Sequence, residues 1–340
     1  MAYRKKPKKL TKKQKKQRTQ FGIMGLIILF SFTIGLTLGR SENPDYSINE
    51  RILQFKEEVT AFFQEEMGWS NEKKELKEQE VQAGQFRFLD VGQGSATLIQ
   101  SEDGTNILID TGRYEDKDKK ILSYLDQYIG TGGKIDLLIF THNDSDHIGY
   151  GDLILQYYNV QEVWMNGYDS TSKIYERILD ALAQSNAQYA EPKSGENHQI
   201  GPFLLEVLNP TVDPRSNPND DSIVIKMTMG DFSAMLSGDA SSRVEEAIID
   251  SGAELKSTLL LMGHHGSKES SSDEWIEAIQ PGFSIYSAGL TNSYGHPNKE
   301  TIERFELHEI PIYGTAEDGT VTVRVNPNGN YSIDTEKGEH

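Results

Sequence analysis

The chain has 340 residues, of which 36% are hydrophobic, 9% are aromatic and none is cysteine, and its formal net charge is −18 at pH 7. This composition excludes a collagen-like or wholly disordered chain and leaves room for one large domain or two ordinary ones. The lack of cysteine excludes disulfide scaffolds, thiol nucleophiles and thiolate metal sites, so any metal ion would be bound by histidine and carboxylate side chains.

The first 40 residues differ in charge from the rest of the chain. They carry 11 Lys and Arg and no acidic residue, whereas the other 300 carry 23 basic and 52 acidic residues. Residues 19–39 hold no charge, and a helix of that length spans a bilayer core of about 30 Å. Because basic residues favour the cytoplasmic side, we predict a cytoplasmic tail (1–18), a single transmembrane helix (19–39) in the cell membrane, and an extracellular remainder.

Two other interpretations of this N-terminal segment stay open. A cleaved secretory signal is disfavoured because the basic region is long and the uncharged run exceeds the usual length of about 7–15 residues. A nucleic-acid-binding arm is not required, because anionic lipid of the inner leaflet accounts for a basic segment next to the membrane.

An amphipathic stalk helix is expected next, within a stalk and linker over residues 40–84. Ser47 and Glu50 fit a capping box, and apolar residues recur every three to five positions from Ile48 to Met67. This short apolar stripe either docks on the following domain or pairs two chains as a homodimer. Charged residues 70–83 predict the linker, and a single domain is expected over residues 85–340.

Short apolar runs alternate with turn residues and helical patterns from residue 85 onward. Strands are expected at 86–90, 96–100, 106–110, 135–140, 160–165, 203–208, 222–228, 232–237, 258–262 and 283–287. Helices are expected around 121–129, 174–183, 244, 275 and 302. Hairpins mixed with helix-linked strands predict two sheets with helices outside, an α/β sandwich.

The densest group of chemically active residues is T-H-N-D-S-D-H-I-G at 141–149. Directly after an apolar strand it contains four potential metal ligands, His142, Asp144, Asp146 and His147. Helix capping alone needs one Asp or Asn and leaves two histidines unexplained. Imidazole and carboxylate together suit Zn²⁺, Mn²⁺ or Fe²⁺ better than Ca²⁺ or Mg²⁺. The loop therefore predicts a metal site.

More ligands are expected from the ends of other strands, because one loop rarely completes a coordination shell. The candidates that follow apolar runs are Asp110, Asp239, His264 and His265, and His296 in N-S-Y-G-H-P adds another. Taken singly, each has a simpler explanation, since an Asp at a strand end before Gly is commonly a turn residue. Their shared position favours one common site.

The ordered motifs L-I-D-T-G, T-H-x-D-x-D-H, S-G-D and H-H-G-S resemble those of the metallo-β-lactamase fold hydrolases. With F-L-D-V-G-Q-G-S-A at 88–96 and Y-G-H-P at 294–297, the chain looks like the version of that domain in the ComEC-type competence proteins. The resemblance covers about residues 85–335 and implies an αββα sandwich with its metals at one edge. The many membrane spans of the ComEC channel have no counterpart here, so we expect a free-standing, single-span relative.

The resemblance assigns a tighter metal ion to Asp146, His147, Asp239 and one of His264 or His265, of which His265 is favoured. A second ion would take His142 and Asp144, with Asp239 bridging. One or two divalent ions, Zn²⁺ or Mn²⁺, are therefore expected.

The second metal position departs from the broader superfamily pattern H-x-H-x-D-H. Asp144 stands where that pattern has its middle histidine, and the further histidine usually found before the bridging Asp does not appear. Asp220 or Asp221 is a possible substitute, whereas His198 lies too early in a predicted hairpin. The same substitutions belong to the ComEC-like pattern, so they indicate a harder, Mn²⁺-tolerant site rather than an inactive one.

Two groups of supporting residues are expected. Those that orient ligands through hydrogen bonds are Asp110, Asp90 and Gln93. Those that donate to substrate oxygens or protonate a leaving group are His264 and His296, unless they are ordinary surface histidines; Asp146 is counted with them as catalytic.

These residues and the ComEC resemblance predict hydrolysis of a phosphodiester by metal-activated water. The substrate would be nucleic acid or a phosphorylated envelope compound. The net charge of −29 beyond residue 40 argues against a polyanion, unless a basic groove forms around Lys268, Lys299 and Arg304 or Trp164 and its neighbours stack bases. A β-lactam or other amide or ester hydrolase, and a non-catalytic binding domain on a stalk, are the alternatives.

Overall fold

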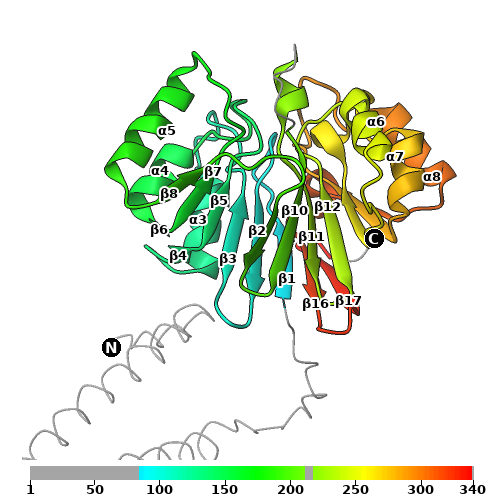
Figure 1. The fold of residues 1–340 in the computed structure, drawn as a ribbon, viewed down its shortest axis with the longest axis horizontal. Coiled ribbons are helices and arrows are strands. Elements are labelled where there is room, and N and C mark those ends of the chain that lie inside the picture. The colour runs from blue at the N-terminus through cyan, green and yellow to red at the C-terminus, as the bar shows by residue number, and fades with distance from the viewer. Residues whose placement is uncertain (1–83, 211–216, 339–340) are drawn as a thin grey trace, which may run out of the picture. The chain divides into compact units, whose positions relative to one another are not determined.

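The computed structural model describes residues 84–210 and 217–338 (Figure 1). The expected cytoplasmic tail, transmembrane helix, stalk helix and almost all of the linker lie outside these residues. Within the two described ranges, no helix is long and apolar enough to cross a membrane.

An eight-stranded sheet is formed by six strands from the first half of the domain and the last two strands of the chain. Its order is β17-β16-β1-β2-β3-β5-β7-β8. The strands are β1 (Gly84–Phe88), β2 (Thr97–Ser101), β3 (Asn106–Ile109), β5 (Leu137–Ile139), β7 (Glu162–Trp164), β8 (Gln188–Ala190), β16 (Val321–Val325) and β17 (Tyr331–Thr335). Pairing is antiparallel from β17 to β3 and parallel from β3 to β8. A separate parallel pair joins β4 (Lys134–Ile135) to β6 (Asn159–Val160).

A seven-stranded sheet forms the second half, in the order β15-β14-β13-β12-β11-β10-β9. Its strands are β9 (Asn197–Ile200), β10 (Phe203–Asn209), β11 (Val224–Met229), β12 (Phe232–Leu236), β13 (Leu259–Leu261), β14 (Phe283–Tyr286) and β15 (Ile312–Gly314). Pairing is antiparallel from β9 to β12 and parallel from β12 to β15. Residues of β10 alternate between buried and half-buried, whereas every residue of β13 and β14 is buried, as expected where helices cover the second face of a sheet.

Helices flank the two sheets on opposite sides (Figure 1). On one side lie α3 (Lys120–Tyr128), α4 (Gly151–Tyr157) and α5 (Lys173–Gln184), and on the other α6 (Ser242–Asp250), α7 (Asp273–Ile279) and α8 (Lys299–Leu307). The short helices are α9 (Thr315–Asp318), η1 (Pro218–Asp221) and η2 (Gly263–Gly266). One apolar cluster draws on strands of both sheets, and one further cluster underlies each helical layer. The expected α/β sandwich is confirmed.

The parallel strands of both sheets end in the segments that carry the predicted ligands. Asp110 directly follows β3, the 141–149 loop follows β5, and Asp239 follows β12. The helix η2 follows β13 with only Met262 between them. Because parallel strands place their carboxyl ends at one edge of a sheet, the fold brings these segments to a common rim.

Candidate metal centre

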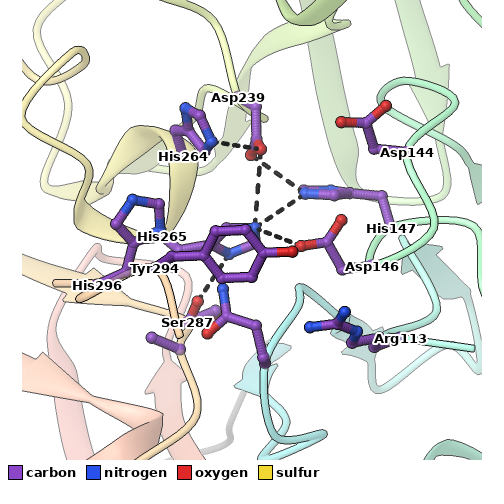
Figure 2. A network of polar contacts seen from close by, with 12 residues as sticks. Arg113, Asp144, Asp146, His147, Asp239, His264, His265, Ser287, Tyr294 and His296 are labelled. Atoms are coloured by element: carbon purple, nitrogen blue, oxygen red, sulfur yellow. Dashed lines mark hydrogen bonds and ion pairs between the residues drawn. The ribbon is translucent and has the colours of Figure 1, made fainter. Parts of the chain in front are cut away.

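Side chains from four strand ends meet at this rim (Figure 2). His147 Nε2 lies 3.1 Å from Asp239 Oδ1 and 3.2 Å from His265 Nε2. His265 Nε2 lies 3.4 Å from Asp146 Oδ2. We call Asp146, His147, His265 and Asp239 the inner group; Asp239 also belongs to the next group.

A second set of contacts continues from Asp239 toward the surface. His142 Nε2 lies 3.7 Å from Asp239 Oδ2 and 3.7 Å from Asp144 Oδ2. We call His142, Asp144 and Asp239 the outer group. The His142 side chain is 1% exposed, whereas that of Asp144 is 52% exposed. The outer group is therefore open to solvent at the Asp144 carboxylate.

The donor atoms fit a divalent cation. Two overlapping triads have their ligand atoms within 4.8 Å of one another, His142 with His147 and Asp239, and Asp146 with His147 and His265. His142 Nε2 is buried without a hydrogen-bond partner in the part of the chain that is described. A cation would satisfy that nitrogen and would separate the Nε2 atoms of His147 and His265, and imidazole with carboxylate is a donor set of Zn²⁺, Mn²⁺ and Fe²⁺.

Hydrogen bonds on the far side of the inner histidines fix their orientation. Asp110 Oδ2 accepts a hydrogen bond from His147 Nδ1 (2.7 Å), and the same carboxylate accepts from the backbone N–H and the hydroxyl of Thr141. His265 Nδ1 donates to the backbone carbonyl of Ser287 (2.8 Å). Both histidines therefore turn Nε2 toward the cluster, which is the arrangement that tunes a ligating imidazole. Of these partners, only Asp110 was expected from the sequence.

Strained backbone conformations gather at the site. Asp110, His264 and His265 have φ values of 58°, 50° and 57°, the left-handed region that ordinary side chains avoid. Each such residue costs about 1–3 kcal/mol and persists only where its surroundings enforce it. The two consecutive left-handed histidines turn His265 into the inner group, while His264 Nε2 lies 3.6 Å from Asp239 Oδ2. In Figure 2, His264 and Asp144 lie on opposite sides of Asp239.

Charge coupling sets the pKa values of the inner histidines and carboxylates. Burial opposes protonation of His147, but the carboxylates of Asp239 and Asp110 hold its pKa well above the ordinary histidine value. Burial likewise opposes ionisation of Asp239, yet the neighbouring histidines hold its pKa well below the ordinary value. The pKa of Asp146 is lowered in the same way, against its burial, by the hydrogen bond with His265. The carboxylates are thus anionic at neutral pH, ready to bind a cation.

The two histidines proposed for proton transfer differ from His147 in the direction of their pKa shifts. Burial lowers the pKa of His264, and burial together with the charges of His264 and His265 lowers the pKa of His296 to about 4. The rings of His264 and His296 lie 5.2 Å apart in an edge-on arrangement. At neutral pH His296 is therefore a neutral imidazole, which donates a hydrogen bond rather than acting as a cationic acid.

Some residues considered from the sequence lie elsewhere. Asp90 accepts from the Gly92 N–H and pairs with Lys120 at 3.4 Å, rather than contacting a predicted ligand in the described ranges. His198 packs against the Trp164 ring and pairs with Glu196. Asp220 accepts a hydrogen bond from the hydroxyl of Ser241 and is in neither triad.

Comparison with known proteins places the chain in a family. A sequence profile of the metallo-beta-lactamase superfamily matches residues 89–289. The chain belongs to this superfamily. Its relatives include ComE operon protein 3 of Bacillus subtilis, 30% identical over 74% of this chain and 34% of the relative. Competence protein ComA of Neisseria gonorrhoeae is 26% identical over 68% of this chain and 31% of that protein.

These relatives are ComEC-type competence proteins, as the sequence motifs predicted, and the chain spans about a third of their length. Among solved structures, CmlA, a diiron beta-hydroxylase from Streptomyces venezuelae, superposes with a TM-score of 0.50 at 13% identity, covering 72% of this chain and 54% of CmlA. That similarity shows the fold alone. The chain is thus a metal-dependent hydrolase of the metallo-β-lactamase superfamily with competence-related homologues.

Proposed function

We propose that this domain is a phosphodiesterase held outside the cell membrane by the N-terminal hydrophobic segment. The observation that carries the activity is the position of Asp239 in both the inner and the outer group. Two adjacent cation positions that shared this carboxylate would suit displacement at phosphorus, because the ions held there would stabilise the charge on both the attacking and the leaving oxygen.

The chain's own residues have separable tasks in this proposal. Asp146, His147 and His265 would hold one ion, His142 and Asp144 a second, and Asp239 would link them. When bound, the ions supply Lewis acidity and a water activated for attack at neutral pH. With an ion bound, Asp110 would hold the one remaining proton of His147 on Nδ1, so that Nε2 is the ligand atom.

His264 and His296 are assigned to the substrate side of this arrangement, because His264 Nε2 lies 3.6 Å from Asp239 Oδ2 and the His296 ring lies 5.2 Å from that of His264. Both are neutral at pH 7, because burial lowers the pKa of each. A neutral imidazole donates an N–H to a substrate oxygen without adding a charge. Hydrogen bonding to the leaving oxygen is the task we assign to them.

DNA as the substrate has mixed support. The relatives are named for competence, which favours nucleic acid. However, two of the three cations expected to line a groove are engaged elsewhere: Arg304 donates to the carbonyls of Ser270 and Ser271, and Lys299 pairs with Glu303. Trp164, considered for base stacking, is fully buried in the core. We therefore propose a phosphodiesterase first and a DNA nuclease as one form of it.

The activity can be tested on the full chain purified in detergent and loaded with Mn²⁺ or Zn²⁺. Hydrolysis of bis-p-nitrophenyl phosphate is expected, with loss of turnover in Asp146→Ala and full turnover in the control Lys134→Ala, whose side chain is 54% exposed on β4. A protein that binds metal but does not turn over this substrate would contradict the proposal. Linear DNA in the same assay separates a nuclease from an esterase of small substrates.

A further inference from the structure

A buried amide nitrogen without a partner among the described residues belongs to Gln93, on the loop that contacts the backbone of Asp146. Gln93 Oε1 accepts a hydrogen bond from the backbone N–H of Gly289 (3.2 Å), two residues after the Ser287 carbonyl that holds His265. Because that N–H needs an acceptor, the amide orientation is fixed and Nε2 is the remaining atom. Gln93 Nε2 is buried and forms no hydrogen bond with any residue in the described ranges. An unsatisfied buried donor is costly unless a ligand accepts from it.

The loop that carries Gln93 is pressed against the metal-site loop. Gly94 has a φ of +130°, and a Cβ built there would lie 2.4 Å from the backbone oxygen of Asp146 and 3.2 Å from the backbone nitrogen of Arg113. No larger residue fits this position. Gln93 is therefore held next to the ligand Asp146, with the start of the Arg113 segment against the same glycine.

Arg113 places a permanent cation at the edge of the cluster. Its Nε donates to Glu115 (2.8 Å), which raises the pKa of the guanidinium, and its guanidinium carbon lies 5.8 Å from the centre of the Tyr294 ring. Figure 2 shows Arg113 next to Asp146 and Tyr294. With Nε occupied and one face of the group toward Tyr294, the terminal nitrogens remain to bind an anion, which a guanidinium does in a bidentate manner.

We propose that Gln93 Nε2 and the Arg113 guanidinium bind the non-bridging oxygens of a phosphodiester beside the metal cluster, an inference that rests on the proposed function. The site also contains the carboxylates Asp144, Asp146 and Asp239, which repel an anion. A phosphodiester has two non-bridging oxygens, so one would remain for this pair if the other bound the cations. An amide or ester carbonyl presents a single oxygen and leaves the terminal nitrogens of Arg113 without a substrate oxygen to bind, so this pair selects phosphoryl over acyl substrates.

Two variants test the pair without removing a metal ligand. Gln93→Glu keeps an acceptor for the Gly289 N–H but replaces the donor with a negative oxygen. Arg113→Gln removes the cation. The matched control is Arg324→Gln on β16, because Arg324 is also paired with a carboxylate, Asp334, and its side chain is 33% exposed against 31% for Arg113.

The probe is dimethyl phosphate, titrated into the Mn²⁺-loaded full chain by calorimetry, with metal content measured for every variant. Each test variant is expected to weaken binding by about tenfold or more, as for loss of a hydrogen bond to a charged group, with metal content unchanged and the control equal to wild type. Wild-type affinity in both variants, no binding to the wild type, or metal loss that accounts for the weakening would overturn the inference.

The two proposals fail separately in these experiments. Binding of dimethyl phosphate through Gln93 and Arg113 without hydrolysis of bis-p-nitrophenyl phosphate would contradict the phosphodiesterase proposal and support the anion site. Hydrolysis with an unchanged kcat/KM in both variants would support the phosphodiesterase proposal and contradict the anion site.

Discussion

The inner and outer groups share Asp239 but differ in how firmly the protein holds them. In the inner group, His147 and His265 are almost fully buried, and each is oriented by a hydrogen bond on its far nitrogen, to Asp110 and to the Ser287 carbonyl. In the outer group, the far nitrogen of His142, Nδ1, contacts only the hydroxyl of Thr141 (3.2 Å) among the described residues, and Asp144 is half exposed. Orientation by neighbouring groups strengthens metal binding, so the inner position should bind its ion more tightly.

This difference also bears on the departure from the superfamily pattern. The substitution at Asp144 and the missing histidine both fall on the outer group, where the protein provides fewer supporting contacts. A position built from one histidine and two carboxylates is harder than one built from two histidines, and it favours Mn²⁺ relative to Zn²⁺. The two positions are therefore expected to differ in metal preference as well as in affinity.

The largest effect is expected from Asp239→Asn, because Asp239 lies within 3.7 Å of His142, His147, His264 and His265. Loss of its charge removes a ligand from both groups. We expect metal content to fall at both positions and turnover to disappear. Elemental analysis and the esterase assay check this, and retention of either ion would show that the groups do not depend on one shared carboxylate.

The contrast between the groups is tested directly by comparing Asp144→Ala with Asp146→Ala. The first variant loses a half-exposed contact to His142, whereas the second loses the partner of His265. We expect Asp144→Ala to keep one tightly bound ion per chain and Asp146→Ala to lose the tighter one. Metal titration of the two variants gives the answer, and equal losses would mean that the positions are equivalent.

Much of this site follows from the sequence because each ligand motif directly follows an apolar run. Parallel strands end at one edge, so His142, Asp239 and His265 were expected together. The supporting contacts made by Thr141 and Ser287 were not expected, because these are common residue types with no diagnostic spacing. The left-handed backbone at His264 and His265 could not be predicted from the sequence either, because glycine is the residue that usually marks that conformation.

The supporting residues outside the site were also hard to assign from sequence. Asp90 and Asp110 both follow strands, but only Asp110 reaches a histidine, whereas Asp90 pairs with Lys120. The choice depends on tertiary packing that the local pattern does not encode. Sequence therefore predicts which strand ends carry ligands better than it predicts which carboxylate supports them.

A smaller effect is expected from Asp110→Asn, which keeps the shape of the side chain and tolerates the left-handed conformation. It replaces the anionic acceptor of His147 Nδ1 with a neutral amide. Removal of such a partner costs about 10–100-fold in metal affinity, and only the inner position should weaken. Competition with a chelator measures this, and an equal weakening of the outer ion would contradict the separation of the two groups.

The smallest effect concerns the loop after His264 and His265, and it appears in stability rather than activity. Glu245 on α6 accepts hydrogen bonds from the backbone N–H groups of Ser271 and Ser272, and burial raises its pKa above the ordinary value despite them. A carboxyl group with a raised folded-state pKa contributes stability that is full below its unfolded pKa and is lost as pH rises through the folded value. The side-chain amide in Glu245→Gln cannot titrate, so the contribution of this position to the free energy of unfolding is constant with pH. Denaturant unfolding of both proteins from acid to neutral pH should therefore show the wild type losing stability relative to the variant, and a parallel pH dependence would show that this carboxyl group titrates normally.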